Sequence, residues 1–128
     1  MTTNSKSIKA YKILICDDEE GIRESLKLIL EDQFDLVLTD NGNECLNILK
    51  NTKDIGLVLM DIKMPQTSGL DILEKIKIGY PDINVIIVTG YKSVETATEA
   101  VRRGANGYIV KPFKSEEILS VVRKNLSI

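Results

Sequence analysis

The chain alternates short apolar runs with longer amphipathic segments, and this alternation constrains its fold more than any other feature. Five apolar runs have the length of β-strands and are rich in Val, Ile and Leu. They occupy residues 12–16, 34–39, 56–60, 84–89 and 107–111. Each run is followed by a segment of helical length with an apolar face, such as Leu26, Ile29 and Leu30 in the first. Because regular alternation of strand and helix implies right-handed crossovers, we expect an α/β fold with one parallel sheet covered on both faces.

The composition of the apolar runs predicts their order in this sheet. Runs 12–16, 56–60 and 84–89 are almost continuously apolar, as strands buried on both faces should be. Run 34–39 alternates somewhat and run 107–111 is short, which suits edge strands. We therefore expect a doubly wound (βα)5 sheet of the flavodoxin-like kind with strand order 2-1-3-4-5. Its ligand site should lie beyond the carboxyl ends of the strands, between the first and the third.

The segments between the runs carry signals for where helices begin. Ser68 with Asp71 three residues later resembles a capping box, and Ser115 stands before two acidic residues where the last helix should start. The helix expected over residues 93–102 has a thin apolar face. Its apolar residues are Val94, Ala97, Ala100 and Val101. Because poorly anchored segments lie at the low-stability end of a fold, we expect this helix to move most easily.

Length and charge limit the class of protein. A chain of 128 residues makes one domain, which we assign to residues 11–128, and the polar residues 1–10 are expected to be a disordered extension. The net charge of -2 argues against nucleic-acid binding by this domain. No apolar run approaches the roughly 20 residues of a membrane span, and the first residues lack the apolar region of a signal peptide. We therefore expect a cytoplasmic protein without membrane contact.

Cysteine and histidine usage narrows the chemistry. Cys16 and Cys45 do not have the spacing of a metal site, and two cysteines do not make a disulfide framework. The sequence contains no histidine. Any reaction that needs an imidazole must therefore take it from a partner.

Polar side chains follow the carboxyl ends of four of the predicted strands. These are Asp17 and Asp18, Asp61, Thr89 and Lys111. Three carboxylates brought this close together repel one another and raise one another's pKa values unless a cation lies between them. Oxygen ligands of this kind suit Mg²⁺, which keeps several waters when the protein offers few ligands. The sequence therefore predicts a magnesium site at this edge of the sheet.

The acidic loop after the first strand also excludes other phosphate sites. A dinucleotide site or P-loop would place glycines there, whereas this loop reads CDDEE, and we expect Glu19 and Glu20 to begin the first helix. Phosphate chemistry can still proceed with a metal, because an aspartate can attack phosphorus and form an aspartyl phosphate. Lys111 and Thr89 would then hold the phosphoryl oxygens.

Each of these residues also has an ordinary structural interpretation. Asp17 and Asp18 could cap a helix, and Asp61 could begin a turn. Thr89 is a common strand residue, and Lys111 taken alone would be a solvated charge at a strand end. The functional interpretation depends on the five residues meeting at one place.

Four sequence motifs resemble the receiver domains of two-component response regulators. They are "CDDEE", "LVLMDIKMPQTSGLDIL", "VIIVTGY" and "GANGYIVKPF". Each is weak alone, but their order and spacing are specific to that family. The resemblance covers the chain from about Lys12 to Leu126.

The resemblance implies a role for each site residue. Asp61 is expected to be the phosphoacceptor, with Lys111 and Thr89 as catalytic residues. The metal would be Mg²⁺, with Mn²⁺ as an alternative ion. Its expected ligands are Asp17, Asp18, Asp61 and the backbone carbonyl of Lys63. Thr89 and Tyr108 resemble the family's switch pair, although Tyr108 taken alone would be a core aromatic residue.

Three further details follow from the resemblance. The Lys111–Pro112 peptide bond is expected to be cis and to aim the ammonium group into the site. Lys63 and Tyr91 stand at positions that influence how readily water reaches the phosphoryl group, and their bulk leads us to expect slow self-dephosphorylation. Ser68 replaces an Asp that is common in the family, which we expect to affect helix capping more than chemistry.

The resemblance also predicts partners. A sensor histidine kinase or a histidine phosphotransfer protein would donate the phosphoryl group. Phosphorylation would then repack the fourth helix, fifth strand and fifth helix of the (βα)5 unit, and so control an output domain, a protein partner or a phosphorylation-dependent homodimer. The segment from Thr89 to Phe113 looks closest to receivers that precede transcriptional output domains. Such a protein is not an enzyme beyond its own phosphorylation and dephosphorylation.

Two other classes of function remain open. A Mg²⁺-dependent phosphatase of the haloacid dehalogenase type would use an aspartyl nucleophile on phosphate esters, but it usually carries a second Asp where this chain has Lys63. A degenerate receiver would act as a docking module without phosphorylation. Against the second class, all five site positions keep competent residue types.

Overall fold

The apolar runs form a single parallel sheet. The computed structural model describes residues 11–128, and the predicted N-terminal extension, residues 1–10, lies outside the described residues. The strands of the sheet are β1 (Lys12–Cys16), β2 (Asp35–Thr39), β3 (Ile55–Met60), β6 (Asn84–Thr89) and β7 (Gly107–Val110). Their order is β2-β1-β3-β6-β7 and every pairing is parallel. This confirms the predicted order 2-1-3-4-5 and its two edge strands.

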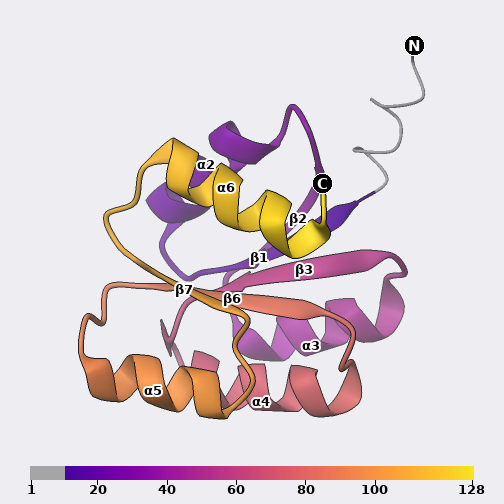
Figure 1. Ribbon diagram of the computed structural model, residues 1–128. Coiled ribbons are helices and arrows are strands. Elements are labelled where there is room, and N and C mark those ends of the chain that lie inside the picture. Colours follow the sequence, from indigo (N-terminus) through magenta and orange to yellow (C-terminus); the bar gives the residue numbers. More distant parts are fainter. Residues whose placement is uncertain (1–10) are drawn as a thin grey trace.

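Five helices cover the two faces of the sheet. They are α2 (Glu20–Leu30), α3 (Gly42–Asn51), α4 (Gly69–Gly79), α5 (Val94–Arg102) and α6 (Ser115–Leu126). Helices α2 and α6 lie on one face, and α3, α4 and α5 lie on the other (Figure 1). None of the helices within residues 11–128 combines the length and apolar character needed to span a membrane.

Alternation along the central strands builds a core on each face. In β1, Ile13 and Ile15 pack toward α2 and α6, whereas Leu14 and Cys16 pack toward α3 and α4. All four side chains are completely buried. Strands apolar on both faces must lie inside the sheet, which explains why β1, β3 and β6 occupy its centre.

A short hairpin between β3 and α4 was not predicted. It pairs β4 (Lys63–Met64) with β5 (Thr67–Ser68) in antiparallel register. Gln66 in its turn has a φ of 68°, in the left-handed region. The hairpin carries the chain from the end of β3 to the start of α4, so it lies directly beside Asp61.

The helix starts follow the sequence signals in part. Ser68 is the N-cap of α4 and accepts a hydrogen bond from the backbone N–H of Leu70 at 3.2 Å. Asp71 does not complete a capping box, because its carboxylate pairs with Arg103 instead. Helix α6 begins at Ser115 as expected, although its N-cap residue is Lys114, whose side chain makes no capping hydrogen bond.

Candidate functional site

Two central strands place a pair of buried carboxylates side by side. Asp17 follows β1 and donates its backbone N–H to the carbonyl of Thr39 at 3.1 Å. Asp61 follows β3 and donates its N–H to the carbonyl of Cys16 at 3.0 Å. The hydrogen bonding between strands thus continues one residue beyond β1 and β3, and it fixes the backbone of Asp17 and of Asp61. The two residues are only 2% and 4% exposed.

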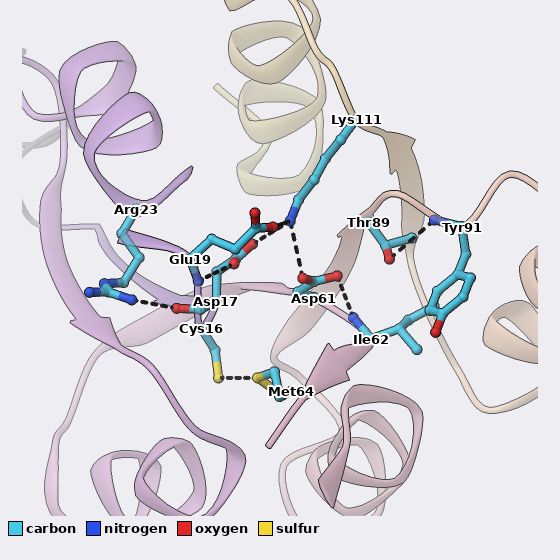
Figure 2. Close-up of polar contacts among 10 residues, drawn as sticks. All are labelled: Cys16, Asp17, Glu19, Arg23, Asp61, Ile62, Met64, Thr89, Tyr91 and Lys111. Carbon is cyan, nitrogen blue, oxygen red and sulfur yellow. Dashed lines mark hydrogen bonds and ion pairs between the residues drawn. The ribbon is translucent and has the colours of Figure 1, made fainter. Parts of the chain in front are cut away.

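Lys111 reaches these carboxylates from the end of β7. Its backbone N–H donates to the carbonyl of Thr89 at 2.8 Å, and its peptide bond to Pro112 is cis, as the resemblance led us to expect. Its Nζ lies 2.9 Å from Asp17 Oδ2, 3.0 Å from Asp61 Oδ2 and 3.1 Å from Glu19 Oε1 (Figure 2). One ammonium group therefore neutralises part of a cluster of three carboxylates.

The electrostatics of the site follow from this burial and pairing. Burial raises the pKa of Asp17 above its ordinary value, although hydrogen bonds from Lys111 and from the Glu19 N–H oppose this rise. Burial by itself would lower the pKa of Lys111, but hydrogen bonds with Asp17 and Asp61 outweigh it and raise that pKa. Lys111 is thus held as a cation, and the site retains an excess of negative charge.

The donor set fits a hard divalent cation. Carboxylate oxygens of Asp17, Asp18, Glu19 and Asp61 lie within 4.8 Å of one another. Asp17 and Asp61 are buried, whereas Asp18 and Glu19 are exposed, so a bound ion would keep access to water. An all-oxygen, partly open site of this kind suits Mg²⁺ better than a soft metal.

A pocket opens beside the carboxylates. Its volume is about 250 Å³, and its lining residues are Glu19, Asp61, Lys63, Thr89, Gly90, Tyr91 and Lys111. Ile62 donates its backbone N–H to Asp61 Oδ1 at 2.7 Å, which fixes the orientation of that carboxylate. Figure 2 shows Thr89 and Tyr91 on the side of Asp61 opposite Asp17. Carboxylate, ammonium and hydroxyl groups therefore share a space large enough for a phosphoryl group.

Tyr108 contacts this pocket through Tyr91. Its hydroxyl donates a hydrogen bond to the backbone carbonyl of Tyr91 at 2.8 Å, and the Tyr91 N–H donates to Thr89 Oγ1 at 3.4 Å. Burial and then the negative charge of Asp61 raise the pKa of Tyr108. The two predicted switch residues are therefore joined by one intervening residue, and Tyr108 is not itself among the described residues that line the pocket.

Comparison with known proteins identifies the family of the chain. The family model of the response regulator receiver domain matches residues 13–123. The chain belongs to this receiver domain family. A putative NtrX-like response regulator from Rickettsia bellii is 38% identical over 115 residues, which make up 88% of this chain and 24% of that protein. The chain therefore spans only about a quarter of the length of that relative.

Solved structures support the same fold. The receiver domain resembles a CheY-like receiver domain protein from Methanospirillum hungatei with a TM-score of 0.87 and 34% identity, over 91% of this chain and 94% of that one. It resembles the BeF3-activated DrrB receiver domain with a TM-score of 0.84 and 27% identity, over 91% of this chain and 97% of that one. The flavodoxin-like fold expected from the sequence is thereby confirmed.

Two residues of the receiver domain's site were missed by sequence reasoning. Glu19 was expected only to begin the first helix, and it is indeed the N-cap of α2, but its side chain also turns toward Lys111. Gly69 was not singled out at all. A Cβ added to Gly69 would lie 1.8 Å from the carbonyl oxygen of Asp61, so only glycine fits there. The Ser-Gly pair that ends the "MPQTSG" motif was the available signal for this close approach.

Sulfur atoms pack directly beneath the receiver domain's acidic cluster. Cys16 Sγ lies 3.4 Å from Met64 Sδ, which joins β1 to the hairpin (Figure 2). Interaction with Cys45 and burial raise the pKa of the Cys16 thiol. Both cysteines are free and buried, so they act as core residues rather than as reactive thiols.

Proposed function

We propose that this chain is a phosphorylation-dependent signalling switch in which Asp61 receives the phosphoryl group. The observation that carries the proposal is the setting of Asp61. Its Oδ1 accepts from the Ile62 N–H at 2.7 Å and its Oδ2 lies 3.0 Å from the Lys111 ammonium, at the edge of a pocket of about 250 Å³. A carboxylate held in one orientation beside a cation is prepared for attack on phosphorus.

The donor must supply the imidazole that this chain lacks. In the proposed transfer, the phosphorus–nitrogen bond of a phosphohistidine breaks while a bond forms between phosphorus and an Asp61 carboxylate oxygen. A proton from solvent then neutralises the released imidazole nitrogen. The donor is a sensor histidine kinase or a histidine phosphotransfer protein, which is the kind of partner that membership of the receiver family supports.

We assign the remaining groups to positioning and charge neutralisation. Asp17, Asp18, Asp61 and the backbone carbonyl of Lys63 would hold Mg²⁺, or Mn²⁺ in its place, and the ion would supply positive charge to the transferring phosphoryl group. Lys111 donates hydrogen bonds to one phosphoryl oxygen and Thr89 to another. A backbone hydrogen bond from the Lys111 N–H to the Thr89 carbonyl fixes the two strand ends from which these donors reach.

We propose that Thr89 and Tyr108 transmit the modification. A phosphoryl group on Asp61 adds strong acceptor oxygens, and a Thr89 hydroxyl drawn toward them would weaken its contact with the Tyr91 N–H. The Tyr108 hydroxyl donates a hydrogen bond to the Tyr91 carbonyl, so a movement of Tyr91 would pass to β7 and α5. The surface of α5, β7 and α6 then controls an output domain, a protein partner or a second copy of the chain.

Further properties belong to the same proposal. Lys63 and Tyr91 line the pocket, and we propose that their bulk slows attack by water and so gives a long-lived phosphoprotein. We place the protein in the cytoplasm and assign residues 11–128 to the receiver unit, without direct binding of nucleic acid.

Two rival functions are less well supported. A phosphatase with an aspartyl nucleophile usually uses a second Asp two residues later as general acid, and this chain has Lys63 there. A phosphorylation-independent docking module would not need the buried carboxylates of Asp17 and Asp61, whose charges are costly to bury.

One experiment separates the three functions. The protein is incubated with Mg²⁺ and phosphoramidate, whose phosphorus–nitrogen bond resembles that of phosphohistidine, and separately with p-nitrophenyl phosphate. We expect one phosphoryl group on the wild type by intact mass, none on Asp61→Asn, and a wild-type result for Asp40→Asn, which changes an exposed carboxylate outside the site. Steady release of nitrophenol would support the phosphatase, and the absence of both products would support the docking module.

A further inference from the structure

Helix α5 is attached to the fold mainly by its ends. Of its nine residues, all of them described, Ala100 alone is buried. Val94 is 81% exposed and Val101 is 64% exposed. Burial of apolar surface therefore contributes little to holding α5, and its polar contacts decide how firmly each end is fixed.

The C-terminal end of α5 is tied to α4 by Arg103. The Arg103 Nη1 lies 2.6 Å from Asp71 Oδ1 and 3.6 Å from Glu74 Oε1, both on α4. Its Nε lies 2.8 Å from Glu99 Oε2 on α5 itself. Helix α4 is in turn fixed by three completely buried residues, Ile72, Leu73 and Ile76. One guanidinium thus joins the end of α5 to a rigid element through two carboxylates of α4, Asp71 and Glu74.

Backbone contacts fix the same end to the sheet. Asn106 exchanges hydrogen bonds with β6, donating its N–H to the Val85 carbonyl at 2.7 Å and accepting the Val85 N–H on Oδ1 at 2.9 Å. Lys77 of α4 donates to the same Oδ1 at 3.2 Å. A Cβ added to Gly104 would lie 2.9 Å from Lys77 Cγ, so the segment that follows α5 packs closely against α4.

The N-terminal end of α5 has a different kind of attachment. Ser93 caps the helix by accepting the Thr96 N–H at 3.1 Å, a contact inside the helix that does not reach the sheet. Its connection to the sheet passes through Tyr91, whose carbonyl accepts from Tyr108 and whose N–H makes a long, 3.4 Å bond to Thr89. This end is therefore held by the residues that the proposed switch would move.

We propose that Arg103 is a positioning residue that fixes the C-terminal end of α5 against α4, so that switching pivots the helix about this end and displaces its N-terminal end. This inference rests on the proposed function, because it assigns the path along which the Asp61 signal leaves the site. The ion pairs of Arg103 with α4 fix the C-terminal end of α5 in both states of the switch. The hydrogen bond between Tyr108 and Tyr91 holds the N-terminal end, and its loss frees that end.

The pivot determines which surface changes. A groove of about 450 Å³ runs between α5 and β7, and its lining includes Val94, Ala97 and Val101 from the helix with Tyr108 and Val110 from the strand. Because the pivot lies beyond Arg102, the displacement grows toward Val94. The groove therefore changes most at the end nearest the phosphorylation site.

Amide hydrogen exchange read by mass spectrometry tests the pivot. The wild type, Arg103→Gln and Arg102→Gln are compared with and without Mg²⁺ and beryllofluoride, a mimic of the phosphoryl group. Arg102 is the matched control, because its guanidinium pairs with Glu99 on its own helix and its side chain is 72% exposed. In the wild type, beryllofluoride should change exchange at residues 93–98 and leave residues 99–105 unchanged.

The variants decide whether Arg103 sets this pattern. Without beryllofluoride, Arg103→Gln should speed exchange at residues 99–105 by about fivefold, the effect expected for losing an ion-pair network of modest strength. With beryllofluoride, both halves of α5 should respond in Arg103→Gln, and Arg102→Gln should behave as the wild type. Equal responses of both halves in the wild type, or identical results for the two variants, would overturn the pivot.

Failure of the pivot is distinguishable from failure of the proposed function. Intact mass after phosphoramidate treatment reports Asp61 phosphorylation independently of α5. A phosphorylated protein whose two halves of α5 respond equally refutes the pivot alone. A protein that gains no phosphoryl group and shows no response to beryllofluoride refutes both the switch and the motion assigned to α5.

Discussion

At the scale of single residues, the site is defined by how Lys111 and the carboxylates share charge. The ammonium lies within 3.1 Å of oxygens from Asp17, Glu19 and Asp61. It balances one of the negative charges, so the remaining charge continues to favour a second cation. Burial of these carboxylates is therefore costly to the fold when no metal ion neutralises them.

Asp17 should therefore destabilise the metal-free protein. Burial raises its pKa above the ordinary value of 3.8, so ionised Asp17 opposes folding at any pH above that value. We expect Asp17→Asn to raise the free energy of unfolding at neutral pH by roughly 0.5–2 kcal/mol, the usual gain when a strained functional group is removed. Urea unfolding in a chelating buffer measures this change in the free energy of unfolding.

The pH dependence provides the control for this prediction. The difference between Asp17→Asn and the wild type should shrink as the pH falls toward 3.8 and vanish below it, because Asp17 is then protonated in both folded and unfolded states. Asp18→Asn, which changes an exposed carboxylate of the same cluster, should alter the stability at neutral pH much less. A loss of stability in Asp17→Asn at neutral pH would contradict this interpretation of the site.

Glu19 should contribute to cation affinity although it is exposed. Its carboxylate lies in the acidic cluster and pairs with Lys111 at 3.1 Å. Removing a unit charge about 4 Å from a doubly charged cation in water costs about 2 kcal/mol, so we expect Glu19→Gln to weaken Mg²⁺ binding about 30-fold in titration calorimetry at low ionic strength. Glu20→Gln, which changes the next residue in the chain, should bind Mg²⁺ as the wild type does. Equal affinities in the two variants would remove Glu19 from the site.

A site residue could be predicted where the sheet fixes its position, and not where a side-chain contact does. Asp17, Asp61 and Lys111 could be predicted because each directly follows a strand of the parallel sheet, and the sheet brings the carboxyl ends of its strands together whatever the side chains do. Glu19 could not be predicted in the same way. Its direction is set by a contact with Lys111, 92 residues away, which competes with an ordinary role at the start of α2.

At the scale of elements, the hairpin between β3 and α4 shows where sequence patterns fail. Strands β4 and β5 have two residues each, too few to display the period-two alternation that identifies a strand. The thin apolar face of α5 was predicted correctly, because helical periodicity over nine residues is long enough to read and only Ala100 is buried. That α5 moves on phosphorylation stays a prediction.

The junction between the hairpin and α4 should tolerate no side chain. Gly69 donates its N–H to the Ile62 carbonyl at 2.8 Å, and an added Cβ would meet the Asp61 carbonyl oxygen at 1.8 Å. We expect Gly69→Ala to destabilise the protein by about 3–5 kcal/mol, at the upper end for overpacking, because backbone must move. Thermal unfolding measures the loss of stability, and Mg²⁺ affinity measures the accompanying change at Asp61.

Gly21 is the matched control for this substitution. It lies within α2, and an added Cβ would meet no atom within 4 Å. Gly21→Ala should therefore stabilise the protein by about 0.5–1 kcal/mol through helix propensity. A similar, small effect for both substitutions would show that Gly69 does not constrain Asp61.

At the scale of the whole molecule, the topology could be predicted because strand composition reports burial. Central strands β1, β3 and β6 are apolar on both faces, so their place in the sheet follows from their own residues. The site lies at the switch point between β1 and β3, where parallel sheets bind ligands. Hydrogen bonds such as the one between Tyr108 and Tyr91 could not be predicted, because they depend on side-chain torsions rather than on topology.

The central claim is that Asp61, among all the carboxylates of this protein, accepts a phosphoryl group. The most direct measurement is borohydride trapping after treatment with acetyl phosphate and Mg²⁺, because borohydride reduces an acyl phosphate to an alcohol and marks its position permanently. Peptide mass spectrometry should find the reduced side chain at position 61, and omitting Mg²⁺ should remove it. A reduced side chain at another carboxylate, or none while the protein binds Mg²⁺, would contradict the claim.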